Sequence, residues 1–184
     1  NARTLFFSGL TDYKLALALS EYTSNLQFAD PVLQMGVPKL LNSLDALHLY
    51  SNGAHYVKDW TLPSAIATGP VKEWTRFVLR KALQKATVVV APVHELDDLG
   101  LEELAGKTLI TATVNDERMA QLRDKGVSMV IDGSPTMNGH VLGANLLDAM
   151  ILAATGKAPQ DIQEDDYLEI ITGLDSEPRI VYPN

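Results

Sequence analysis

Short apolar segments that alternate with helical segments constrain the fold of this chain more than any other feature. Residues 87–91 and 127–131 are apolar at nearly every position instead of at every second one. Such uniformly apolar strands are typical of parallel sheets with both faces covered. Six strands are predicted, at residues 4–8, 25–29, 87–91, 107–114, 127–131 and 179–182, the last on an edge. The sequence therefore predicts an α/β fold: a doubly wound, mainly parallel sheet of five to six strands with helices on both faces.

The segments between these strands carry helical signals. Helices are predicted at residues 12–22, 71–85, 99–105, 116–125 and 141–155, with a further acidic helix start at 161–167. Apolar residues recur at three- and four-residue steps in 71–85, which places Trp74 in the core. Residues 32–50 are leucine-rich and predict two helical pieces, whereas 51–70 are rich in turn formers. If the leucine-rich stretch forms an exposed apolar face, we expect a homo-oligomer.

Composition excludes several classes of function. The 184 residues include 23 acids and 15 bases, giving a formal charge of −8, so no broad basic face is available for nucleic acid. No apolar stretch reaches the roughly 18 residues that a membrane span needs. The absence of cysteine excludes disulfides and thiolate ligands, and the four histidines lack metal-site spacing. We therefore expect a cytoplasmic protein with no metal, no membrane and no nucleic-acid partner.

The start of the chain predicts how it was prepared. Asn1-Ala2 resembles the remnant of a cleaved purification tag, and the first predicted strand follows at once without an initiator Met. We therefore expect residues 1–2 to be a cloning scar. Residues 3–184 are then one Rossmann-like domain cut from a longer protein, whose upstream domain is missing.

The turn after the first strand is a candidate cofactor site, because doubly wound sheets bind ligands outside the carboxyl ends of their strands. Gly9, Leu10 and Thr11 stand where a helix N-terminus would face a pyrophosphate. Asp30 ends the second strand where an acid would bind ribose, and it would favour NAD over NADP by repelling a 2′-phosphate. Only one glycine is present where G-x-G-x-x-G has three. The alternative is that Gly9 only makes the turn and Asp30 only starts a loop before Pro31.

A second candidate is the polar stretch 132–145, which follows the fifth predicted strand. Its glycines, the hydroxyls of Ser134 and Thr136, and a helix beginning near His140 would form a concavity with free N–H groups for an anion or nucleotide. The alternative is a tight connection in which Gly143 lets the helix pack against the sheet. The cofactor-binding residues predicted here and after the fourth strand are Thr111, Thr113, Asp132, Gly133, Gly139 and Gly143.

Catalytic residues are not assigned by any motif. No Ser-His-Asp order, P-loop or pair of catalytic carboxylates can be assembled from the sequence. His94, which follows the third strand, and His140 are the local candidates for proton transfer. The alternative for each is a solvated loop histidine.

Three stretches carry a family resemblance: 107–114 (KTLITATV), 122–127 (LRDKGV) and 135–149 (PTMNGHVLGANLLDA). They resemble the carboxy-terminal half of bacterial proteins described as quinate 5-dehydrogenase-like, with fainter similarity over most of the chain. Thr111-Ala112-Thr113 is also similar to the Asn-Ala-Thr-Ser element of shikimate dehydrogenases, with Thr111 in place of Asn. The resemblance implies an oxidoreductase with a Rossmann-like NAD(P) domain, whose catalytic Lys and Asp belong to a separate domain.

Two functions from different classes remain open. The resemblance implies an NAD(P)-binding domain of a quinate/shikimate dehydrogenase-like enzyme, incomplete without its upstream domain. The missing glycines favour a non-catalytic Rossmann-like module that senses a small ligand or mediates assembly. A small-molecule ligand is the expected partner of a dehydrogenase and of a sensor alike.

Overall fold

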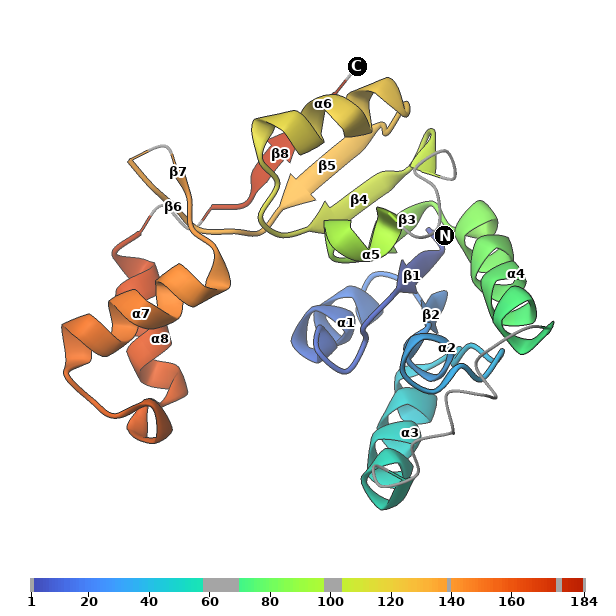
Figure 1. The fold of residues 1–184 in the computed structure, drawn as a ribbon, viewed down its shortest axis with the longest axis horizontal. Helices are drawn as coiled ribbons and strands as arrows, with labels where there is room; N and C mark the ends of the chain where they lie inside the picture. The colour runs from blue at the N-terminus through green and yellow to red at the C-terminus, as the bar shows by residue number, and fades with distance from the viewer. Residues whose placement is uncertain (1, 58–69, 98–103, 139, 175–176, 184) are drawn as a thin grey trace.

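The computed structural model describes residues 2–57, 70–97, 104–138, 140–174 and 177–183, and its centre is a six-stranded sheet (Figure 1). The sheet order is β2-β1-β3-β4-β5-β8. The strands are β1 Thr4–Phe6, β2 Leu26–Phe28, β3 Val88–Val90, β4 Thr108–Thr111, β5 Met129–Asp132 and β8 Arg179–Val181. Strands β1 to β5 pair in parallel, and β8 pairs antiparallel with β5 at the edge. The predicted doubly wound, mainly parallel fold is confirmed.

The register of the parallel strands brings their carboxyl ends to one edge of the sheet. Phe6 pairs with both Phe28 and Val90, and Thr111 pairs with Asp132. The order reverses between β1 and β3, because the chain first adds β2 on one side and then crosses to the other. In folds of this kind the ligand crevice lies at that reversal.

Two apolar clusters cover the two faces of the sheet. The first packs the inner residues of α4 (Pro70–Lys85), α5 (Val93–Asp97) and α6 (Asp116–Asp124) against Leu5, Val89, Leu109 and Val130. The second packs Ala16 of α1 (Tyr13–Ser20) and Leu47 of α3 (Leu44–Val57) against Phe6, Phe28 and Val90. Successive strand residues point to opposite faces, so uniformly apolar strands supply both cores. Helices therefore cover both faces, as predicted.

The leucine-rich stretch folds into two helices, α2 (Asp30–Met35) and α3, separated at Gly36, as its pattern predicts. Gly36 takes the left-handed conformation, with φ 64°, that ends α2. Leu47 is buried, while Leu33 and Leu49 are exposed. Helix α3 runs on to Val57, so the prediction of turns from residue 51 is wrong for 51–57, and its remainder before Pro70 lies outside the described residues. Self-association stays a prediction.

Helix α4 forms as predicted but turns a different face to the sheet. Trp74 and Phe77 are 57% and 51% exposed, so the placement of Trp74 in the core is wrong. Leu79, Ala82 and Leu83, at steps of three and four, form the buried stripe instead. The exposed rings contact each other with centroids 5.9 Å apart.

The polar stretch after β5 departs most from prediction. A hairpin of β6 (Thr136–Met137) and β7 (His140–Val141) replaces the expected helix start near His140, and α7 spans Ala144–Thr155. Figure 1 shows α7 and α8 (Glu164–Thr172) packed together and standing apart from the sheet. The hairpin carries the chain away from the sheet edge before α7 begins, so Gly143 caps α7 rather than seating it on the sheet.

The predicted helix at 99–105 lies almost entirely outside the described residues. Within the described ranges, no helix is long and apolar enough to cross a membrane.

Candidate functional site

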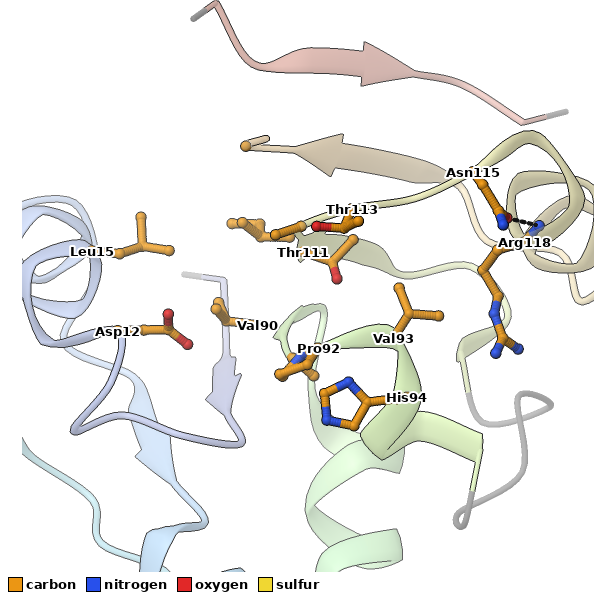
Figure 2. A pocket seen from close by; sticks show the side chains of 14 residues that line it. Asp12, Leu15, Val90, Pro92, Val93, His94, Thr111, Thr113, Asn115 and Arg118 are labelled. Carbon is orange, nitrogen blue, oxygen red and sulfur yellow. Dashed lines mark hydrogen bonds between the residues drawn. The ribbon is translucent and has the colours of Figure 1, made fainter. Parts of the chain in front are cut away.

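A crevice of about 650 Å³ opens where β3 and β4 end, beside the reversal of strand order (Figure 2). Its apolar wall includes Leu15, Val90, Val93 and Ile110. Its polar lining includes Asp12, His94, Thr111, Thr113, Asn115 and Arg118. The crevice thus combines an apolar surface with a few polar groups, which is the usual character of a small-molecule site.

The structure brings together only part of the predicted site. Thr111, Thr113, Gly133 and His94 line the crevice, whereas Gly9, Leu10, Thr11 and Asp30 do not. Asp132, His140 and Gly143 are not part of the crevice lining. Asp132 is buried, His140 is exposed on β7, and Gly143 caps α7. Gly139 lies outside the described residues. Asp12 and Asn115, which also line the crevice, were not predicted, although each stands at a helix start that follows a strand.

The turn after β1 is closed by Asp30. Its carboxylate is completely buried and accepts hydrogen bonds from Gly9 N–H at 2.9 Å and Leu10 N–H at 3.0 Å. A Cβ on Gly9 would lie 2.3 Å from Cδ1 of Phe28, so the glycine is required by this close packing. In this arrangement the turn does not fit a pyrophosphate, because two N–H groups that a phosphate would use already have an anionic acceptor.

Asp132 closes the turn after β4 in the same way. Its carboxylate is 1% exposed and accepts from the N–H groups of Thr113, Val114 and Ser134 at 3.0–3.1 Å. Arg179 on β8 lies 3.5 Å from the same carboxylate. Asp30, which follows β2, binds the loop after β1, and Asp132, at the end of β5, binds the loop after β4. Since β3 lies between β1 and β4, the two carboxylates fix the loops on either side of it.

The end of β4 carries two unusual threonines. Thr113 has φ 60°, a conformation that is strained for a β-branched residue, and its N–H donates to both Asp132 and the Ser134 hydroxyl. Thr111 is 8% exposed, and its Oγ1 is buried with no hydrogen-bond partner in the described structure. Figure 2 shows this oxygen pointing into the crevice. A buried hydroxyl without a partner is costly, and it marks a position where a ligand would supply the missing bond.

Carboxyl groups gather on the β1 side of the crevice. Burial raises the pKa of Asp12, with repulsion from Asp30 adding to the effect. Burial also raises the pKa of Asp30, against the opposing effect of its backbone hydrogen bonds. Burial raises the pKa of Glu95 on α5; His94 opposes this rise, and repulsion from Asp12 and Asp30 adds smaller upward effects. We call Asp12, Asp30 and Glu95 the acidic cluster.

The acidic cluster predicts a pH dependence of stability. Because the folded-state pKa of Glu95 lies above 4.5, its stabilising contribution is full below pH 4.5 and is lost as pH rises through the raised value. We therefore expect Glu95→Gln to flatten the decline in unfolding free energy above pH 4.5, measured by urea denaturation at a series of pH values. The exposed Glu169→Gln variant is the control. Equal pH slopes in Glu95→Gln and wild type would contradict the burial of this charge.

Fold and site together define a doubly wound α/β domain with a ligand-sized crevice at the reversal of its strand order. The family described as a domain of unknown function, DUF8754, matches residues 1–183, and the chain belongs to this family. No curated protein and no solved structure matches the chain.

Proposed function

We propose that this domain is a ligand-binding module whose crevice at the ends of β3 and β4 holds a small hydrogen-bonding molecule. The observation that carries the proposal is the Thr111 hydroxyl, which is buried, points into the crevice and has no hydrogen-bond partner among the described residues. A ligand that forms a hydrogen bond with Oγ1 would supply the missing partner. Binding would gain affinity because the Thr111 hydroxyl is already desolvated and loses no bond to water when the ligand binds. The crevice volume falls in the range of about 300–1,000 Å³ typical of small-molecule sites.

The geometry favours a sensing role over catalysis. The buried carboxylates around the crevice hold backbone loops in place and are not directed at a position where a substrate would react. Asp30 and Asp132, the most deeply buried acids around the crevice, are both engaged with backbone N–H groups. Thr113 is likewise held by Asp132 and Ser134. The rim is therefore preorganised to receive a ligand, which lowers the entropic cost of binding.

Thr111→Val tests the proposal because it removes the hydroxyl with little change in shape. Without ligand, we expect the variant to be more stable by about 1 kcal/mol, since an unsatisfied buried hydroxyl is lost. That difference corresponds to a rise in Tm of about 2–4 °C for a chain of this length. With ligand, we expect affinity to fall by about 2- to 10-fold, the value of one hydrogen bond. Thermal denaturation with a panel of nucleotides, nucleosides and amines measures both effects.

Thr108→Val is the matched control, because Thr108 lies at the opposite end of the same strand. It should leave ligand affinity unchanged. The proposal is wrong if compounds that stabilise the wild type stabilise Thr111→Val to the same extent.

A second candidate is the NAD(P)-dependent dehydrogenase domain. Residues Thr111 to Thr113, which resemble an element of shikimate dehydrogenases, line the crevice together with His94, and this specific coincidence supports it. Thr111 and Thr113 would then contact the cofactor, which would supply hydride transfer when bound, and His94 would be the local proton carrier. Calorimetric titration with NAD, NADH, NADP and NADPH tests this candidate. Binding weakened by Thr111→Val, together with a change in nicotinamide absorbance on adding a hydroxy acid, would favour the enzyme over the sensor.

A further inference from the structure

Two polar groups face the same crevice from opposite walls. Asp12 comes from the turn before α1, and Thr111 comes from the end of β4. Figure 2 shows the carboxylate of Asp12 and the hydroxyl of Thr111 both directed toward the open space. Val90 and Ile110 supply apolar surface in the same lining. A ligand that reaches both polar groups must therefore carry two polar ends and an apolar middle.

Asp12 is the member of the acidic cluster that lines the crevice, whereas Asp30 and Glu95 do not. The carboxylate of Asp30 is engaged by the N–H groups of Gly9 and Leu10. Asp12 stands at the N-cap position of α1, yet its side chain makes no capping hydrogen bond. It is half-buried and lines the crevice instead of binding its own helix.

The charged groups around Asp12 determine whether a positive or a negative group of a ligand binds favourably beside it. Asp30 and Glu95 lie near enough to affect the electrostatics of this wall. The cationic side chain of Arg118 also lines the crevice, but Figure 2 shows it on the side away from Asp12, beyond Val93. A phosphate or carboxylate at this wall would meet like charge in a partly desolvated site, whereas a protonated nitrogen would meet complementary charge.

A metal cation does not account for the same wall. In the part of the chain that the structure describes, no group of three or more His, Asp or Glu side chains is arranged to hold a metal ion. An organic cation needs fewer ligands, because one carboxylate and an apolar surface suffice to bind an ammonium group and its hydrocarbon.

We propose that the crevice binds a small organic ammonium compound, with its protonated nitrogen against Asp12, its hydrocarbon against Val90 and Ile110, and a second polar group on Thr111. The unpartnered hydroxyl of Thr111 is the independent observation that marks the crevice as a ligand site. This inference rests on the proposed ligand-binding function and adds the chemical class of the ligand.

Three probes with one skeleton and different charge test the inference. Tyramine, tyrosol and para-hydroxyphenylacetate share a phenol that can hydrogen-bond to Thr111, and they end in an ammonium, a hydroxyl and a carboxylate. NMR titration of the labelled protein measures each affinity. We expect tyramine to bind about tenfold more tightly than tyrosol, since hydrogen bonds to charged groups are the stronger ones. The carboxylate should bind most weakly of the three.

Asp12→Asn should remove the advantage of tyramine over tyrosol, whereas Thr111→Val should weaken both. Asp45→Asn, an exposed Asp at the start of α3, is the control and should change neither affinity. If the carboxylate binds as tightly as tyramine while still depending on Thr111, the ammonium inference is overturned and the ligand-binding function stands. If no probe perturbs the crevice residues, both the inference and the proposed function are overturned.

Discussion

Asp132→Ala is expected to lower the free energy of unfolding by about 4 kcal/mol, because three N–H groups, two of them in buried bonds, would lose their anionic acceptor and each such bond contributes about 1.5–3 kcal/mol before relaxation. A loss of this size is a large part of the roughly 5–15 kcal/mol that stabilises a typical domain. Urea denaturation followed by circular dichroism measures it. The exposed Asp124→Ala is the matched control and should change stability by about 0.5 kcal/mol or less.

Asp132→Asn sharpens the same test. Oδ1 of Asp132 accepts from Thr113 and Ser134, whereas Oδ2 accepts from Val114. An amide keeps one acceptor oxygen, so we expect Asp132→Asn to lower the free energy of unfolding by about half as much as Asp132→Ala does. If Asp132→Ala and Asp124→Ala unfold at the same urea concentration, the carboxylate does not hold the β4 loop as described.

The second large effect is expected at Gly9. A Cβ at this position would lie 2.3 Å from Cδ1 of the Phe28 ring, which is itself stacked on Phe6. Gly9→Ala should therefore destabilise the domain by about 2–3 kcal/mol, at the upper end of the cost of overpacking. Gly53→Ala is the control, because Gly53 lies in α3 with nothing within 4 Å of an added Cβ. There the substitution should stabilise by about 0.5–1 kcal/mol.

Opposite signs at Gly9 and Gly53 are the expected result of thermal denaturation on the two variants. A neutral Gly9→Ala would contradict the close approach to Phe28. The same packing makes Gly9 variants a poor probe of ligand binding, since they would disturb the core. Thr111→Val, which changes a crevice hydroxyl and little else, is the better probe.

The fold could be predicted because its strands are apolar on both sides, a pattern that strands of a half-solvated antiparallel sheet do not show. The segment 141–155 shows where the pattern fails. Its helix is apolar nearly all round, which suggested that it covers the sheet, but the β6–β7 hairpin diverts the chain and α7 packs against α8. Apolar composition predicts that a helix packs against something, and it does not say against which element.

The site could be predicted only in part, for reasons of strand pairing. The sequence identified Asp30 and Asp132 as important and assigned them to a cofactor. Their hydrogen bonds to the loops of neighbouring strands depend on β2 lying beside β1 and β5 beside β4, which one sequence does not reveal. Thr111 was identified by its place at a strand end. That its hydroxyl has no partner within the described ranges depends on the packing around it.

Ligand binding is expected at the ends of β3 and β4, with Asp12 the residue contributed by the β1–α1 connection, and not on the N–H groups of Gly9 and Leu10. The most direct test is a ¹H–¹⁵N NMR titration of the protein, in parallel, with tyramine and with NADH. We predict that the amide signals of Thr111, Thr113 and His94 move on binding, while those of Gly9 and Leu10 stay in place. Shifts concentrated at Gly9 and Leu10, with Thr111 unchanged, would contradict the crevice as the binding site and place the ligand in the first turn.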